Sequence, residues 1–225
     1  MKQGSLYEAL FQIGTLIFVI IIVHATYVTV IRPNAELIQE QQQLMQEQNP
    51  DIVPERSVFI IIRDYEQEFC IIFFLWAVTI IGMKTQHTLR QRALLERTLV
   101  KLQDGMSILP EDSRNYARPV QALAPKEKEF LLPRALLAGL HRFQSTQNIH
   151  AVSSIIKDTC ETEADRMETE LSIVRYIAWA IPSIGFLGTV RGIGTALGQA
   201  YQAVAGDIAG VTQSLGVAFN STFVA

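Results

Sequence analysis

Residue types that build enzyme active sites and disulfide frameworks are scarce in this sequence. It contains two cysteines and four histidines in 225 residues. Cys70 lies in an apolar run and Cys160 in a charged segment beyond it, so we interpret both as unpaired, buried or half-buried thiols. There is no Ser-His-Asp set, phosphate-binding loop, metal-ligand spacing or pair of catalytic carboxylates. We therefore expect neither an enzyme nor a metal or cofactor site.

The distribution of charge gives no sign of a nucleic-acid partner but predicts a membrane protein. The net charge is −3, and the basic residues are dispersed. By contrast, Ala9–Ile31, about 23 residues long, contains no Asp, Glu, Lys or Arg. An apolar run of about 18 residues or more is typical of a transmembrane helix. This run exceeds the roughly 7–15 residues of a signal-peptide core, so we expect residues 1–31 to hold a retained first membrane helix.

One polar residue in this first helix, His24, has two interpretations. Either it relays protons, or it lies near the outer interface and hydrogen-bonds to a neighbour. It stands eight residues before Arg32, about 12 Å along a helix, and this position favours the interface.

A second membrane helix is predicted at residues 69–83. Its core of about 15 residues is short for a bilayer, so its ends must extend or the bilayer must thin. Basic residues follow it closely and mark the cytoplasmic side: Lys84, Arg90, Arg92, Arg97 and Lys101. The connection at 32–68 holds three basic and eight acidic residues, a net charge of −5. We therefore expect this connection in the periplasm and the N-terminus in the cytoplasm.

Two pieces of the periplasmic connection have a recognisable pattern. Glu36–Gln48 spaces its apolar residues as an amphipathic helix does, and Pro50 and Pro54 are expected to end that helix. Ser57–Ile62 is a short apolar piece for which an interfacial helix and a strand both remain open.

Residues 84–172 are predicted to form a cytoplasmic helical region. It should contain an amphipathic helix closed by Gly105, a proline-rich loop at 105–125, and a helix over Lys126–Gln147 with Pro133 as its start or a kink. Asn148–Glu170 is then expected to form a polar helix that leads into the third membrane span. Its acidic residues are interpreted as a solvated helix face rather than a metal site: Asp158, Glu161, Glu163, Asp165, Glu168 and Glu170.

Two further membrane segments are predicted in residues 173–225. The third span covers Ile173–Leu197, and a fourth begins near Gly210. The fourth has about 16 residues before Ala225, where a complete span needs about 20, so the sequence is expected to end inside a helix. The predicted fold class is an all-α membrane protein with four transmembrane helices, the fourth truncated, and a helical cytoplasmic region between the second and third.

Small and polar side chains distinguish these last two segments. Small residues let helix backbones approach closely in lipid, and the third span has a face of them: Ser183, Gly185, Gly188, Gly192 and Ala196. Polar side chains at bilayer depth usually face a bundle interior or a water-filled path, and the two segments contain several: Thr189, Thr195, Ser214, Asn220, Ser221 and Thr222.

The spans lack a central Asp or Glu, so a proton that crosses here needs a carboxylate from elsewhere. A hydroxyl can donate to a carboxylate and accept from water, which suits the lining of an ion path. It can also bond to a backbone carbonyl of its own helix. On the residues alone, both interpretations of Thr189 and Thr222 are equally good.

The segment Pro182–Ile193, PSIGFLGTVRGI, resembles the P-x-x-G-[LF]-L-G-T-V-x-G-[IM] signature of the ExbB/TolQ/MotA proton-channel superfamily. Asp207–Ala225 resembles the helix that follows in that family, and the likeness covers about the last quarter of the chain. The resemblance implies a multi-pass protein of the bacterial inner membrane. It also implies helix packing through the motif residues Pro182, Gly185, Gly188 and Gly192.

A pentameric ring around two copies of a single-span partner is further implied by the resemblance. The partner would be of the ExbD, TolR or MotB kind, and its aspartate would carry H⁺ or Na⁺. Thr189 and Thr222 would line the ion path beside that aspartate, with Asn220 and Ser221 as further polar lining. The implied function is that of the pore- and ring-forming subunit of an ion-driven motor or energy transducer. The alternative is a non-conducting oligomeric scaffold whose small residues only pack helices.

Two features depart from the ExbB and TolQ pattern. Arg191 stands where an aromatic or aliphatic residue is common, and we interpret it as a pore-mouth charge. It either pairs with an acid of the outer loop or partner, or reaches the lipid headgroups. Two spans precede the cytoplasmic region, as in MotA, and the phage-defence stator subunit ZorA combines such features. The resemblance does not choose among motility, energy transduction to an outer membrane and defence, nor between H⁺ and Na⁺.

Overall fold

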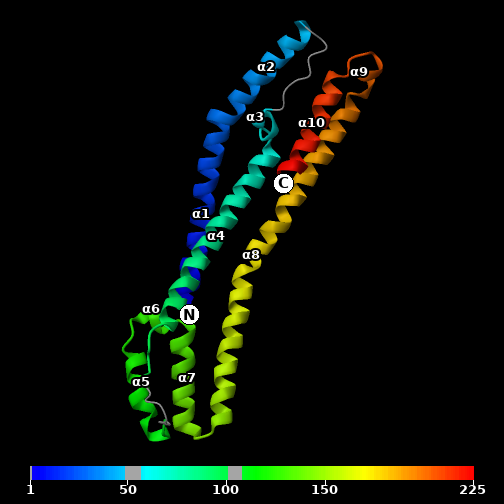
Figure 1. Cartoon of the computed structure of the whole chain (residues 1–225). Coiled ribbons are helices and arrows are strands. Elements are labelled where there is room, and N and C mark those ends of the chain that lie inside the picture. The colour runs from blue at the N-terminus through cyan, green and yellow to red at the C-terminus, as the bar shows by residue number, and fades with distance from the viewer. Residues whose placement is uncertain (1, 49–56, 101–107) are drawn as a thin grey trace. The chain divides into compact units, whose positions relative to one another are not determined.

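The computed structural model describes residues 2–48, 57–100 and 108–225, and every regular element in these ranges is helical. The all-α prediction is therefore confirmed. In chain order (Figure 1) the elements are α1 (Lys2–Thr26), the π-helix η1 (Tyr27–Ile31), α2 (Arg32–Gln48), α3 (Val58–Ile61), α4 (Tyr65–Leu95), the 3₁₀-helix η2 (Pro110–Asp112), α5 (Ser113–Gln121), α6 (Pro125–Lys128), α7 (Leu131–Thr146), α8 (Ile149–Gly198), α9 (Ala200–Val204) and α10 (Ala209–Val224).

Three helical stretches of the described chain are long and apolar enough to cross a membrane. They are Ala9–Met45, Tyr65–Leu95 and Ile149–Gly198. α10 has 16 residues, which is shorter than the roughly 20 that a complete span needs. The prediction of a membrane protein is confirmed, with three full-length candidate spans and one shorter apolar helix where the sequence predicted four spans.

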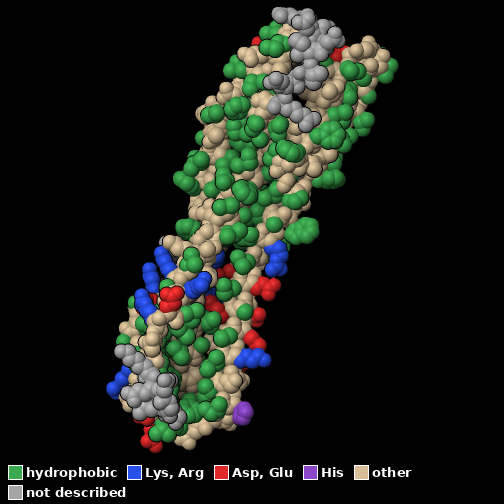
Figure 2. All heavy atoms as spheres, in the orientation of Figure 1, with side chains coloured by type: hydrophobic (Ala, Val, Ile, Leu, Met, Phe, Trp, Pro, Cys, Tyr) green, Lys and Arg blue, Asp and Glu red, His purple; other side chains and the backbone are tan. Residues whose placement is uncertain are grey.

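The chain divides into two compact units. The membrane unit comprises Met1–Ile81 and Val174–Ala225, and the helical unit comprises Gly82–Ile173. Figure 2 shows hydrophobic side chains spread along the whole visible face of the membrane unit. The candidate spans therefore present an apolar surface of the kind that lipid or further subunits cover.

Neighbouring helices of the membrane unit run antiparallel (Figure 1). His24, late in α1, bonds to Glu68, early in α4, while Trp76 Nε1 donates to the carbonyl of Gln12 at 3.1 Å. α8 runs antiparallel to α4, and α10 returns along α8 after the short helix α9. We call the end of the unit at which α9 lies the α9 end.

The first span does not end at Ile31 but continues into α2. Pro33 has no N–H and its ring crowds the preceding turn, and the residues just before Arg32 form the π-helix η1. There the Arg32 N–H bonds to the carbonyl of Tyr27, five residues back, so the wider turn keeps the rod continuous. A buried apolar cluster anchors this region of the rod: Val23, Tyr27, Ile31 and Ile72.

Both patterned pieces of the expected periplasmic connection are helical. The amphipathic helix expected at Glu36–Gln48 lies within α2. Of the two alternatives left open for Ser57–Ile62, the structure has the helix, α3. Pro50 and Pro54 lie outside the described residues.

α4 is longer at both ends than the predicted second membrane helix. It runs from Tyr65 to Leu95, which supplies the length that a bilayer crossing requires. Its first turn holds Glu66 and Glu68, whose charges are favourable at a helix N-terminus. α4 ends at Leu95 rather than near Gly105, and Gly105 itself lies outside the described residues.

In the helical unit, α5 forms where a loop was predicted. Ser113, Ala117 and Val120 recur at helical spacing and are buried, and α5 packs against α7. This burial offsets the N–H that Pro119 lacks, so one proline does not prevent the helix. Pro133 lies in the first turn of α7, so it marks the start of that helix rather than a kink.

A tight turn joins α7 to α8. Gln147 adopts the left-handed conformation with φ 52°, and Asn148 Oδ1 accepts from the backbone N–H of His150 at 2.9 Å. Nearby, Arg134 of α7 donates to the buried Glu163 carboxylate at 2.7 Å, so this acid does not lie on a solvated face as predicted. Within the described ranges, no group of three or more His, Cys, Asp or Glu residues could hold a metal ion.

Candidate ion pathway

α8 and α10 are held together through glycines. Gly185, Gly188 and Gly192 are buried, and a Cβ built on each would lie only 2.3, 2.5 and 2.7 Å from the side-chain carbons of Ala225, Ser221 and Ala218 respectively. Side chains do not approach this closely, so the contact requires glycine at all three positions. We call this contact the glycine seam. Pro182, the first motif residue, is exposed and lies inside the same helix.

The glycine seam brings Thr189 and Thr222 together. Their hydroxyl oxygens are hydrogen-bonded to each other, from α8 to α10. Thr189 Oγ1 also lies 3.1 Å from the carbonyl oxygen of Gly185 and 3.2 Å from that of Ala218. The structure therefore has the bond to a backbone carbonyl that one interpretation required, within a hydroxyl pair, and the lining of an ion path stays a prediction.

The hydroxyl pair has an open side. Thr189 is half-buried and Thr222 is exposed in the single chain. When Thr189 donates its proton to a carbonyl, its lone pairs accept from Thr222, and the lone pairs of Thr222 remain available. An exposed hydroxyl with free lone pairs can accept a hydrogen bond from a protonated carboxyl group or from water.

The other predicted polar residues of α10 are placed differently. Ser221 is buried, donates to the carbonyl of Val217 at 2.9 Å and accepts from Gln67 of α4 at 3.3 Å. Asn220 is half-buried. The structure thus joins Thr222 to Thr189, and it places Ser221 in the contact between α10 and α4.

Arg191 has partners within the chain. Its Nε and a terminal nitrogen contact the two carboxylate oxygens of Glu66, each at 2.8 Å, and a terminal nitrogen lies 3.8 Å from Asp64 Oδ1. Of the two alternatives for this arginine, the structure has the pair with an acid of the expected outer connection. A bidentate guanidinium–carboxylate pair fixes the orientation of the arginine side chain as well as compensating its charge.

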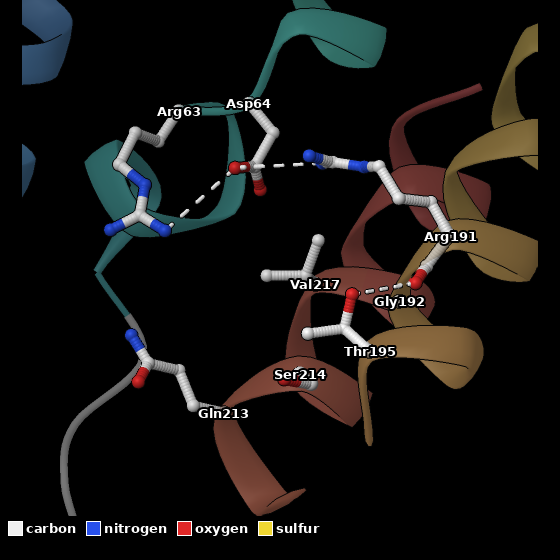
Figure 3. Close-up of a pocket in the computed structure, with 8 residues that line it drawn as sticks. All are labelled: Arg63, Asp64, Arg191, Gly192, Thr195, Gln213, Ser214 and Val217. Carbon is white, nitrogen blue, oxygen red and sulfur yellow. Dashed lines mark hydrogen bonds and ion pairs between the residues drawn. The ribbon is translucent and has the colours of Figure 1, made fainter. Parts of the chain in front are cut away.

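A pocket of about 200 Å³ lies beside this ion pair (Figure 3). Asp64 contributes an oxygen, Oδ2, that is buried and has no hydrogen-bond partner among the described residues. Gly192 follows Thr189 by three residues on α8, so the pocket begins roughly one helical turn, about 5 Å, from the hydroxyl pair toward the α9 end. Its walls come from the start of α4 and from α8 and α10: Arg63, Asp64, Arg191, Gly192, Thr195, Gln213, Ser214 and Val217.

Glu68 is a buried carboxylate that the sequence reasoning placed only at the edge of a span. Its side chain is 7% exposed and pairs with His24 Nδ1 at 2.7 Å and with Arg32 at 2.5 Å. The Arg32 guanidinium also lies over the Tyr65 ring, 4.3 Å from its centroid. His24 therefore has the hydrogen-bonded neighbour that one of its two interpretations required. A signal was present in the alternation of Asp64, Glu66 and Glu68 directly before an apolar run.

Residues 127–225 match the profile of the MotA/TolQ/ExbB proton channel family. This part of the chain is similar to members of that family. The match extends from α6 through α10 and so includes the glycine seam and the hydroxyl pair. No curated protein and no solved structure matches the chain significantly. The match confirms the predicted resemblance to the superfamily over this part of the chain.

Proposed function

We propose that this protein is the pore- and ring-forming subunit of an ion-driven membrane motor or energy transducer. Its partner would be a single-span membrane protein whose aspartate carries H⁺ or Na⁺. The observation that supports this most is the hydroxyl pair of Thr189 and Thr222, presented on a glycine seam inside a membrane unit. Between Ile173 and Ala225 the sequence has a single carboxylate, Asp207, which lies between α9 and α10. The two helices that carry the hydroxyl pair therefore lack an acid at the depth of that pair.

The hydroxyl pair has a defined part in this mechanism. As the partner aspartate arrives in its protonated form, Thr222 accepts from it; toward the charged form, Thr222 donates its proton to the aspartate once Thr189 turns its own proton from the carbonyl to Thr222. Thr189, oriented by the carbonyls of Gly185 and Ala218, keeps Thr222 in place without adding a competing charge. Proton uptake and release at the aspartate would then alter its contact with successive subunits, and this would convert the ion gradient into rotation or force.

The surface of the membrane unit supports assembly into a ring. Tyr176, Trp179 and Phe186 of α8 and Phe219 and Phe223 of α10 are all more than 60% exposed in the single chain. Lipid or neighbouring copies must cover these aromatic side chains. We propose five copies around two partner helices in the inner membrane, with the N-terminus in the cytoplasm and the α9 end in the periplasm.

The test uses the full chain purified from its native membranes together with the single-span protein that co-purifies. Electron cryomicroscopy should show five copies around two partner helices, and vesicles holding the complex should pass H⁺ or Na⁺. Thr189→Ala should abolish this flux while the complex still assembles. Thr212→Ala is the matched control, because the Thr212 hydroxyl donates to the Ile208 carbonyl of its own helix at 3.0 Å. Normal flux through the Thr189→Ala complex would refute the proposed role.

A non-conducting scaffold is the second candidate function. The observation that favours it is that the carbonyls of Gly185 and Ala218 already accept the proton of the Thr189 hydroxyl. In that case Thr189→Ala would lower the stability of the assembly, and wild-type vesicles would pass neither ion.

A further inference from the structure

The Arg191–Glu66 pair lies where a cation would approach the hydroxyl pair from the α9 end. Arg191 follows Thr189 by two residues on α8 and lines the pocket. Its Nε and one terminal nitrogen each lie 2.8 Å from a carboxylate oxygen of Glu66. Figure 3 shows Arg191 reaching across the pocket toward Asp64, at the start of α4. The two carboxylates therefore draw the positive charge away from α10 and toward α4.

The pocket is lined as a water-filled cavity would be. Thr195 and Gln213 are exposed, and six of the eight lining residues have polar or charged side chains. Asp64 Oδ2 is buried without a partner among the described residues, and a buried carboxylate oxygen normally bonds to water when no protein donor reaches it. The side chain of Asp64 is 14% exposed, so the pocket rather than the open surface must supply that water.

We propose that this pocket is the outer vestibule of the ion pathway, and that Glu66 is a positioning residue that holds Arg191 against α4 so that its charge does not close the vestibule to cations. This inference rests on the proposed function for the direction of ion flow. The ligand of the vestibule is water and the transported monovalent cation, H⁺ or Na⁺.

Electrostatics sets the size of the effect. With Glu66 in place, the Arg191–Glu66 pair has no net charge and hardly affects a more distant ion. Without Glu66, the guanidinium keeps only the longer contact with Asp64 at 3.8 Å, an acid that Arg63 also contacts at 3.7 Å, so positive charge is in excess beside the pocket. For a probe ion roughly 10 Å away and an effective dielectric constant of about 40, Coulomb's law then changes the relative encounter rates of a cation and an anion by about tenfold.

The first experiment measures water access and local charge without any need for transport. Single cysteines are introduced by Thr195→Cys and Gln213→Cys in a Cys160→Ala chain, because Cys160 is exposed and Cys70 is buried. Spheroplasts containing the full complex are treated with two membrane-impermeant methanethiosulfonates, one carrying a quaternary ammonium group and one a sulfonate. Phe219→Cys, on the exposed apolar face of α10, is the control for a position in lipid or at a subunit contact.

Both introduced thiols should react with the ammonium reagent, and the thiol of Phe219→Cys should not. Adding Glu66→Gln should lower the ratio of ammonium to sulfonate reaction rates by about tenfold, and adding Arg191→Gln as well should restore it. The proposal that the pocket is the outer vestibule would be overturned if the thiols of Thr195→Cys and Gln213→Cys did not react, or reacted only from the cytoplasmic side. An unchanged ratio in Glu66→Gln would overturn the part assigned to Glu66.

The second experiment asks for rescue of ion flux in vesicles. Glu66→Gln should reduce H⁺ or Na⁺ flux about threefold, the single-ion share of the tenfold change in the cation-to-anion ratio, and the double variant Glu66→Gln/Arg191→Gln should recover most of it. A purely structural role for the pair predicts that the double variant stays as impaired as the single one. If Glu66→Gln fails to assemble, Arg191→Gln alone decides, because the proposal requires flux at or above the wild-type level. Glu40→Gln, an exposed acid of α2, is the control.

The two proposals can fail separately. If the Thr189→Ala complex conducts normally while both introduced thiols react as expected, the role proposed for the hydroxyl pair is refuted and the proposal of the vestibule is retained. If Thr189→Ala abolishes flux while the introduced thiols stay unreactive, the vestibule is wrong and the proposed function stands.

Discussion

The amide nitrogen of Gln67 lies 3.3 Å from the hydroxyl oxygen of Ser221, and both side chains are buried. This contact joins α4 to α10. The residues on either side of Gln67 reach the other helices of the membrane unit, since Glu66 pairs with Arg191 of α8 and Glu68 pairs with His24 of α1. Side chains at the start of α4 therefore contact α1, α8 and α10.

The Gln67–Ser221 contact should show an unequal response to the loss of either partner. Gln67 Oε1 already lacks a hydrogen-bond partner among the described residues. Ser221→Ala removes the acceptor of the amide nitrogen and leaves it buried and unpaired, which costs about 1–3 kcal/mol. Gln67→Leu removes the whole buried amide and should cost less, although it deletes the same hydrogen bond. Thermal unfolding of the purified complex checks this order, and a larger loss in Gln67→Leu would contradict it.

The glycine seam predicts a contrast between two substitutions two residues apart. A Cβ at Gly192 would lie 2.7 Å from the backbone nitrogen of Ala218, whereas a Cβ at Gly194 meets nothing within 4 Å. Gly192→Ala should therefore destabilise the complex by about 2 kcal/mol or more, since backbone atoms cannot move aside easily. Gly194→Ala should be neutral or slightly stabilising, because alanine favours a helix over glycine. Thermal unfolding and yield of the assembled complex measure both.

Shape and hydroxyl chemistry can be separated at Thr222. Thr222→Val keeps the branched shape but removes the hydroxyl that bonds to Thr189, and Thr222→Ser keeps the hydroxyl. If the hydroxyl acts in ion transfer, Thr222→Val should lose at least about tenfold in flux and Thr222→Ser should keep most of it. Vesicle flux at a fixed membrane potential is the measurement. Equal loss in both variants would show that packing, not the hydroxyl, is what the position supplies.

Glu68 should be among the most sensitive residues of α1 and α4. Glu68→Gln leaves Arg32 without its buried counter-charge, and breaking a buried pair in this way costs about 3–5 kcal/mol. Glu40→Gln, at an exposed acid on α2, should stay within about 0.5 kcal/mol of the wild type. Replacing both members in Glu68→Leu/Arg32→Met should recover much of the loss. Thermal unfolding in detergent follows all three variants, and a mild effect of Glu68→Gln would argue against a buried pair.

The sequence was informative where structure follows from local pattern. Apolar runs indicated the first three spans, although the run of the second was short for a bilayer, and the motif between Pro182 and Ile193 predicted that the glycines pack helices. The same motif led to Thr189, which the fold places against Thr222. In each case the decisive residues are close together in the chain, or the helix period sets their positions.

What the sequence could not reveal depends on contacts between distant segments. Glu66 and Arg191 are 125 residues apart, and no period or spacing links them. α5 was missed because prolines were given more weight than the burial of Ala117 and Val120, which depends on α7. The continuation of the first span past Pro33 was also missed. The π turn at Tyr27–Ile31 lets the helix continue although Pro33 has no N–H.

The unbroken rod from α1 through η1 into α2 has a mechanical consequence. α2 contains 17 residues, about 25 Å of helix at 1.5 Å per residue. Because no loop separates it from α1, a load applied to its far end travels along the axis instead of being absorbed by a hinge. That load reaches Tyr27–Ile31 first, beside the Arg32–Glu68 ion pair. A force on α2 would therefore be transmitted to α4 through this charged contact.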